Sequence, residues 1–105
     1  MKILLMCGAG MSTSLLVKKM EKQAKDMGYN DISIDAVPID ELENYVDLYD
    51  VFLLGPQVRY MEKKAKDIIE SKGKKCTTIP PQVYGRVDGK KTLEIALDLA
   101  KKGEI

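Results

Sequence analysis

The sequence predicts an α/β fold: a doubly wound, four-stranded parallel sheet with helices on both faces. Short apolar runs alternate along the chain with longer segments in which apolar residues recur every three or four positions. Crossovers through such helical segments are right-handed and place successive strands parallel. The most economical strand order is 2-1-3-4. At 105 residues the chain fits one compact domain.

The first strand is expected at Ile3–Met6, an uninterrupted apolar run typical of a strand buried on both faces. A helix is expected from Ser12 to Met27, and Gly28 is the residue predicted to end it. Its core-facing stripe comprises Leu16, Met20, Ala24 and Met27.

The middle of the chain predicts two more strands separated by a short acidic helix. Residues 32–37 alternate apolar and polar side chains, which is typical of a strand at a sheet edge. Residues 40–45 favour the short helix. Val51–Leu54 is the clearest central strand, and Gly55-Pro56 closes it.

The last part predicts two helices around a weaker strand. One helix has Val58, Met61, Ala65, Ile68 and Ile69 on its apolar face and ends near Gly73. The strand spans residues 76–79 and stops at Pro80-Pro81. The C-terminal helix carries Leu93, Ala96, Leu97 and Ala100, with Asp88 as its expected cap.

Composition excludes several functions. The formal charge is +1 and the lysines are spread along the helices, so neither nucleic acid nor an acidic membrane is an expected partner. The chain has no histidine, which removes histidine acid/base catalysis and most zinc sites. No apolar run is long enough for membrane insertion or a signal peptide. Two distant cysteines do not make a disulfide framework, which favours a reducing, cytoplasmic location.

The segment after the first strand has the chemistry of an anion-binding loop. It begins with Cys7 and continues through small or hydroxylic residues with one exception, Met11: Gly8, Ala9, Gly10, Met11, Ser12, Thr13 and Ser14. Two glycines let successive N–H groups turn inward, and the following helix directs its positive end toward the loop. In a 2-1-3-4 sheet this loop lies at the switch point where ligands bind. These features favour a nucleophilic thiolate at Cys7 and a phosphoryl group as its ligand.

A packing role and two further phosphate-binding motifs are the alternatives for this segment. A lone cysteine after an apolar strand can be a packing residue, which is the interpretation favoured for Cys76. A Walker A loop needs a lysine, and none occurs between Lys2 and Lys18. The dinucleotide fingerprint fits poorly, because Thr13 stands where a third small residue is needed.

Low-molecular-weight tyrosine phosphatases resemble the pattern more closely, because they also place a cysteine loop after the first strand. Their loop ends in an arginine, where this chain has Thr13, and their Asp-Pro acid is absent here. The loop therefore favours holding a phosphoryl group over hydrolysing it. A cysteine phosphatase or arsenate reductase, and a flavodoxin-like nucleotide-binding module, remain as alternatives.

Three segments together resemble a known family. They are Cys7–Val17, Leu54–Met61 and Tyr84–Gly89, and they are similar to the cytoplasmic IIB proteins of the lactose/cellobiose (chitobiose) class in the bacterial sugar phosphotransferase system. The resemblance implies one IIB domain of this class over residues 1–105, with a four-stranded parallel sheet.

The resemblance also implies a mechanism. Cys7 would accept a phosphoryl group from the phosphohistidine of a IIA protein. It would pass the group to a sugar bound by the membrane permease IIC, a β-linked disaccharide such as cellobiose, chitobiose or lactose. No metal or other cofactor is implied. Gly8 to Ser14 would surround the phosphate.

Three residues are expected at the rim of the site or at a partner surface: Gln57, Arg59 and Tyr84. For Gln57 and Arg59 a solvated helix start is an equal alternative. For Tyr84 the alternative is an aromatic side chain that covers the edge of the core.

Overall fold

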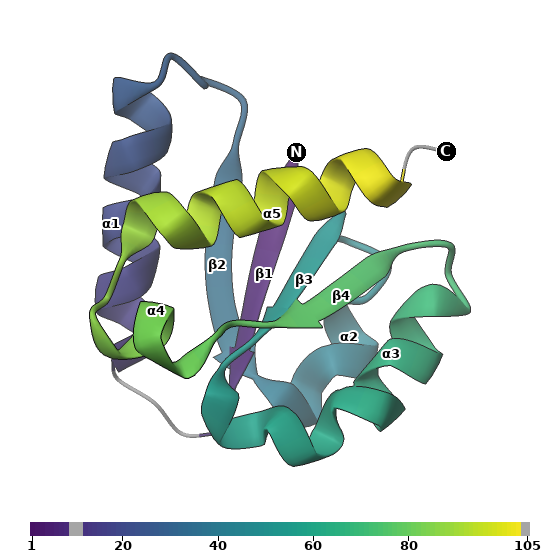
Figure 1. The fold of residues 1–105 in the computed structure, drawn as a ribbon. Helices are drawn as coiled ribbons and strands as arrows, with labels where there is room; N and C mark the ends of the chain where they lie inside the picture. The colour runs from purple at the N-terminus through teal and green to yellow at the C-terminus, as the bar shows by residue number, and fades with distance from the viewer. Residues whose placement is uncertain (9–11, 104–105) are drawn as a thin grey trace.

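The computed structural model describes residues 1–8 and 12–103 (Figure 1). Strands and helices alternate as predicted, with 3-10 helices (η) in two connections. In order they are β1 (Lys2–Cys7), α1 (Ser12–Asp26), β2 (Ser33–Pro38), η1 (Ile39–Glu41), α2 (Leu42–Tyr45), β3 (Val51–Leu54), η2 (Pro56–Met61), α3 (Glu62–Glu70), β4 (Lys75–Thr78), α4 (Pro81–Gly85) and α5 (Gly89–Gly103).

The four strands form one parallel sheet in the order β2-β1-β3-β4, which confirms the predicted topology. Strand β1 is paired on both sides: Leu4 lies level with Asp35 of β2 and with Phe52 of β3. Its apolar run is buried because both faces of the sheet are covered. Strand β2 forms one edge of the sheet, as its pattern predicted. Of its residues only Ile34 is buried, and Ala36, an apolar position of the pattern, is exposed.

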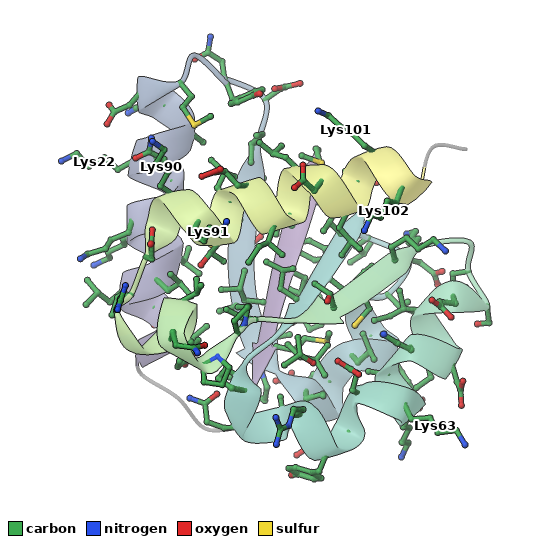
Figure 2. The ribbon with its side chains drawn as sticks, in the orientation of Figure 1. Lys22, Lys63, Lys90, Lys91, Lys101 and Lys102 are labelled. Carbon is green, nitrogen blue, oxygen red and sulfur yellow. The ribbon has the colours of Figure 1, made fainter. Side chains whose placement is uncertain are left out.

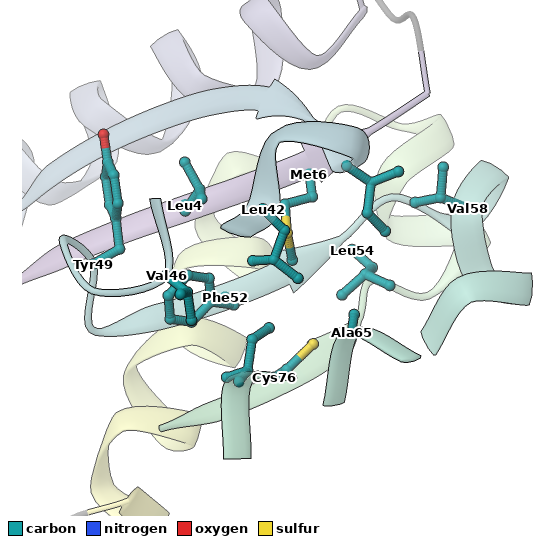
Figure 3. Close-up of a cluster of buried hydrophobic side chains, with 12 residues drawn as sticks. Leu4, Met6, Leu42, Val46, Tyr49, Phe52, Leu54, Val58, Ala65 and Cys76 are labelled. Atoms are coloured by element: carbon teal, nitrogen blue, oxygen red, sulfur yellow. The ribbon is translucent and has the colours of Figure 1, made fainter. Parts of the chain in front are cut away.

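Helices cover the two faces of the sheet in separate layers (Figure 1). On one face α1 and α5 pack against alternate residues of the central strands, in a cluster that includes Ile3, Leu5, Leu53, Leu16 and Leu93. On the other face α2 and α3 pack against the intervening residues. Figure 3 shows this second cluster, which includes Leu4, Met6, Phe52, Leu42 and Ala65.

The ends of α1 and α3 confirm two glycine predictions. Gly28 and Gly73 have φ values of +85° and +74°, a region that favours residues without a side chain. The N–H of Gly28 donates to Lys25 O and that of Tyr29 to Ala24 O, so α1 ends in a Schellman motif. Gly73 and Lys74 repeat the pattern on Glu70 O and Ile69 O.

Three details differ from the sequence prediction. Met27 was expected on the buried stripe of the first helix, but α1 ends at Asp26 and Met27 is 43% exposed because the chain turns away. The segment after β3 is a 3-10 helix with a kink at Val58 before α3 begins. A short helix, α4, begins at the second of the two prolines, Pro81, in a first turn where a missing N–H costs no hydrogen bond.

Charged side chains cover the outer faces of the helices. Lys22 of α1 and Lys90, Lys91, Lys101 and Lys102 of α5 point away from the sheet (Figure 2). All five side chains are exposed to solvent. Within residues 1–8 and 12–103, no helix combines the length and apolar character needed to cross a membrane.

Candidate active site

Cys7 is the last residue of the central strand β1, where the sheet meets the loop. It lies level with Pro38 of β2, and beyond the neighbouring β3 the N–H of Gly55 donates to Met6 O at 2.8 Å. Strands therefore flank Cys7 on both sides at the carboxyl edge of the sheet. The connections from β1 and β3 leave this edge toward opposite faces, which makes it the switch point of the fold.

The loop from Cys7 leads into the N-terminus of α1. Ala9, Gly10 and Met11 lie outside the described residues. Gly8 is exposed, and a β-carbon built on it would lie 3.8 Å from Cγ1 of Val58, so the loop leaves β1 beside η2. Helix α1 begins at Ser12, spans 15 residues and has no acidic side chain in its first turn. Its N-terminal positive charge is therefore not offset by a carboxylate there.

Thr13 and Ser14 have different surroundings. Thr13 is only 2% exposed, and its hydroxyl shares a 3.0 Å hydrogen bond with the hydroxyl of Tyr84. Ser14 is exposed. The structure thus joins two predicted site residues 71 positions apart, Thr13 in the loop and Tyr84 at the expected rim.

Gly55 lies beneath Gln57 and Tyr84. A β-carbon on Gly55 would stand 2.6 Å from Gln57 Oε1, 3.6 Å from Tyr84 Cε1 and 3.5 Å from Met6 O. The Gln57 amide therefore folds back over the end of β3, beside the tyrosine ring. The sequence pattern indicates only that Gly55 ends a strand, and it does not reveal this close approach. The segment Gly55-Pro56-Gln57 is the one local signal, and by itself it is typical of a turn.

Arg59 and Tyr60 follow Gln57 in η2 and are exposed. Tyr60 is 81% exposed, an unusual state for a large aromatic side chain. Sequence reasoning gave it no role. Its place beside Gln57 and Arg59 now adds it to the surface next to the candidate site.

Cys7 and Cys76 are both buried, but Cys7 lies at the carboxyl edge of the sheet and Cys76 lies near the start of β4. Cys76 lies level with Phe52, within the core cluster on the α2 and α3 face (Figure 3). Burial raises the pKa of the Cys76 thiol to about 12, which keeps it protonated at neutral pH. Both thiols are free, and the prediction that Cys76 is a packing residue is confirmed.

A cysteine at the end of the central strand, followed by a loop and a helix N-terminus without an acidic first turn, is typical of proteins that bind phosphoryl groups or similar anions. Comparison with known proteins narrows this class. The family model for "PTS system, Lactose/Cellobiose specific IIB subunit" matches residues 2–95. The chain belongs to this family.

Named relatives agree with the family. The oligo-beta-mannoside-specific EIIB component of Bacillus subtilis (strain 168) is 38% identical, over 93% of this chain and 94% of the relative. The cellobiose-specific EIIB component of Lactococcus lactis subsp. lactis (strain IL1403) is 41% identical, over 92% and 94%. The galactose-specific EIIB component of Lactococcus lactis subsp. cremoris (strain MG1363) is 40% identical, also over 92% and 94%.

Solved structures confirm the fold. The cellobiose-specific phosphotransferase IIB component from Borrelia burgdorferi has a TM-score of 0.81 and 41% identity, over 98% of this chain and 94% of that one. The lactose-specific IIB domain from Streptococcus pneumoniae has a TM-score of 0.84 over 94% and 96%; at 19% identity it supports the fold alone. The expected IIB fold and phosphotransferase-system membership are confirmed. The chain is a sugar phosphotransferase component that works with IIA and IIC.

Proposed function

We propose that Cys7 carries the phosphoryl group in this IIB protein. One observation carries the proposal: Cys7 ends β1 at the switch point of the sheet, immediately before the loop that opens α1. The helix N-terminus and the backbone N–H groups of residues 8–14 are the donors suited to a bound anion. Cys76, the other thiol, lies in the core cluster covered by α2 and α3, and burial there raises its pKa to about 12.

The phosphoryl group is transferred in two steps, first to Cys7 and then to the sugar. The Cys7 thiolate attacks phosphorus on the phosphohistidine of IIA, so that an S–P bond forms while the P–N bond breaks and its electron pair stays on the imidazole. A hydroxyl of the sugar held by the membrane permease IIC then attacks the same phosphorus. The S–P bond breaks, the sulfur leaves as thiolate, and the hydroxyl proton passes to a base on the acceptor side.

The loop is suited to storing the group. Phosphocysteine carries about −1.5 to −2 charges, which the helix end and the N–H groups stabilise without a metal. At position 13, where the similar phosphatases have an arginine, this chain has a threonine whose hydroxyl bonds Tyr84. An arginine guanidinium would stabilise the negative charge on the phosphate oxygens during hydrolysis, and here a neutral side chain takes its place. This favours transfer to a partner over rapid hydrolysis.

The acceptor is a sugar of the kind that the relatives' names describe. Cellobiose and oligo-beta-mannosides are β-linked, which supports a β-linked disaccharide such as cellobiose, chitobiose or lactose as the cargo. A galactose-specific relative of similar identity indicates that the sequence of this domain does not fix the sugar. Because the permease IIC binds the sugar, we infer that IIC selects it.

The proposed docking surface for both partners, IIA and IIC, is the carboxyl edge of the sheet. Gln57, Arg59 and Tyr60 are exposed there, in the helix that follows β3, the neighbour of Cys7. Exposed aromatic and arginine side chains are enriched at protein interfaces. IIA and a membrane-held IIC acting on one Cys7 require a cytoplasmic location for this chain.

Labelling with phosphate tests the proposal. The chain is incubated with IIA phosphorylated from labelled phosphoenolpyruvate, and the labelled peptide is mapped. We expect an acid-stable, iodine-sensitive label at Cys7 and no label in Cys7→Ser, while Cys76→Ser is labelled like wild type. An undiminished label in Cys7→Ser would show that another residue carries the group. Fast partner-independent hydrolysis of an aryl phosphate would favour a phosphatase instead.

A further inference from the structure

The hydroxyl pair of Thr13 and Tyr84 connects the start of α1 to a part of the fold far away in sequence. Thr13 lies in the first turn of α1, next to the loop that begins at Cys7, and is 2% exposed. Tyr84 lies in α4, beyond the last strand. Their oxygens are 3.0 Å apart, a normal hydroxyl–hydroxyl hydrogen bond. A buried hydroxyl must be bonded, so this bond fixes where the Thr13 side chain can lie.

The ring of Tyr84 is held at a second point. Its Cε1 lies 3.6 Å from the position of a β-carbon on Gly55, at the end of β3. Gly55 N–H in turn donates to Met6 O at 2.8 Å, one residue before Cys7. The tyrosine thus reaches from the end of β3, beside the last residues of β1, to the first turn of α1. Strand β1 and helix α1 are the two elements that the loop after Cys7 connects.

The helix that carries Tyr84 is itself fixed by its ending. Val87 N–H donates to Tyr84 O and Asp88 N–H donates to Val83 O, which makes α4 end in a Schellman motif. At the ends of α1 and α3 the corresponding residue is glycine. Here it is Val87, with φ of +51°, a strained conformation for a β-branched residue. Such strain persists only where the surrounding structure determines the conformation, and it clusters near functional sites.

We propose that Tyr84 is a positioning residue for the chemistry of Cys7, acting through Thr13. Its hydroxyl holds the first turn of α1 in place relative to the end of β1, and with it the positive N-terminus of the helix that acts on the sulfur. The inference rests on the proposed phosphocysteine function. It differs from a packing role for Tyr84, because packing needs only the aromatic ring and positioning needs the hydroxyl.

Removing single hydroxyls separates positioning from packing. Tyr84→Phe keeps the ring and Thr13→Val keeps the shape; both lose the hydrogen bond. Two readouts are measured: the rate of phosphoryl transfer from phosphorylated IIA, and the rate of alkylation of Cys7 by iodoacetamide at pH 7, mapped by mass spectrometry. We expect each variant to lower both rates about five- to tenfold, the change that loss of one neutral hydrogen bond produces. Thr13→Ser, which keeps the hydroxyl, is expected to restore them.

The double variant shows whether the two residues act together. If Tyr84 acts through Thr13, Thr13→Val/Tyr84→Phe has the rates of either single variant. Matched controls are Tyr49→Phe, which loses a hydrogen bond to Asp35, and Thr92→Val, which loses one from a buried hydroxyl to Asp88 O. These two hydrogen bonds join other residues than Thr13 and Tyr84, and we expect unchanged rates. Urea unfolding of every variant verifies folding, and Thr13→Ser keeps the comparison valid if Thr13→Val unfolds.

Three results would overturn the inference. The first is that Tyr84→Phe keeps both rates within twofold of wild type. The second is that the two substitutions multiply in the double variant, which shows independent action. The third is faster alkylation in Tyr84→Phe, which shows that the hydrogen bond shields Cys7 instead of positioning the loop. Because alkylation needs no partner, it still decides the inference if wild-type Cys7 takes no phosphoryl label, a result that would refute only the proposed function.

Discussion

Gly89 of α5 stands directly against the backbone of Lys19 in α1. A β-carbon on Gly89 would lie 2.6 Å from the carbonyl carbon of Lys19 and 2.8 Å from its oxygen. Backbone atoms cannot rotate away as a side chain can, so this contact fixes how closely the two helices approach. Because α1 carries the loop of Cys7 at its start and α5 covers the same face of the sheet, the glycine helps to set the position of α1.

Gly89→Ala is therefore expected to destabilise the protein. The two helices must separate to admit a methyl group, and overpacking of this kind costs about 1–3 kcal/mol. Urea unfolding measures the loss. The matched control is Gly85→Ala in α4, because nothing lies within 4 Å of its added β-carbon. Equal stability of the two variants would contradict the close contact.

Gly55→Ala tests Gln57 without altering Gln57 itself. The added methyl would meet the Gln57 amide oxygen at 2.6 Å, while Met6 O and Tyr84 Cε1 stay at ordinary contact distances of 3.5 and 3.6 Å. The flexible amide must therefore move while the fold is kept. We expect phosphoryl transfer from IIA to slow by the same factor in Gly55→Ala, Gln57→Ala and the double variant. Additive effects would mean that Gly55 acts on something other than Gln57.

Much of this site follows from local sequence. The apolar run before Cys7 predicts a buried strand, and the glycine and hydroxyl pattern after it predicts an anion loop. The caps at Gly28, Gly73 and Asp88 also follow from local rules; Asp88 accepts a hydrogen bond from Lys91 N–H at 3.0 Å, as its predicted capping role requires.

The bond between Thr13 and Tyr84 could not be predicted in this way. It depends on a five-residue helix that begins at the second of two prolines, and this helix is too short to show an apolar period. Its end also uses Val87 where glycine is usual, so the local signal for a helix end is missing. The kink at Val58 also could not be predicted, because an apolar helical period does not distinguish a 3-10 turn from the first turn of an α-helix.

Cys76 is expected to resist alkylation under conditions that modify Cys7. With a pKa of about 12, only about one Cys76 thiol in 10⁴ is ionised at pH 8. We expect iodoacetamide at pH 8 to modify Cys7 alone in the folded protein and both cysteines in 6 M guanidinium chloride. Mass mapping of the peptides distinguishes them. Equal modification of the two thiols in the folded state would contradict the core position of Cys76.

Tyr49 and Asp35 predict a loss of stability in strong base. Tyr49 donates a 2.7 Å hydrogen bond to the Asp35 carboxylate, which, together with burial, raises the Tyr49 pKa from 10.0 to about 12. The folded pKa is higher than the unfolded one, so the phenol's contribution is complete below pH 10 and is lost as the pH rises through 12. The stability difference between wild type and Tyr49→Phe should therefore be constant from pH 7 to 9 and shrink above pH 10.

Urea unfolding across this pH range measures the difference, and Asp35→Asn serves as a control because it removes the carboxylate that raises the Tyr49 pKa. A difference that grows with pH would show that the phenolate is favoured in the folded protein, contrary to its hydrogen bond to a carboxylate.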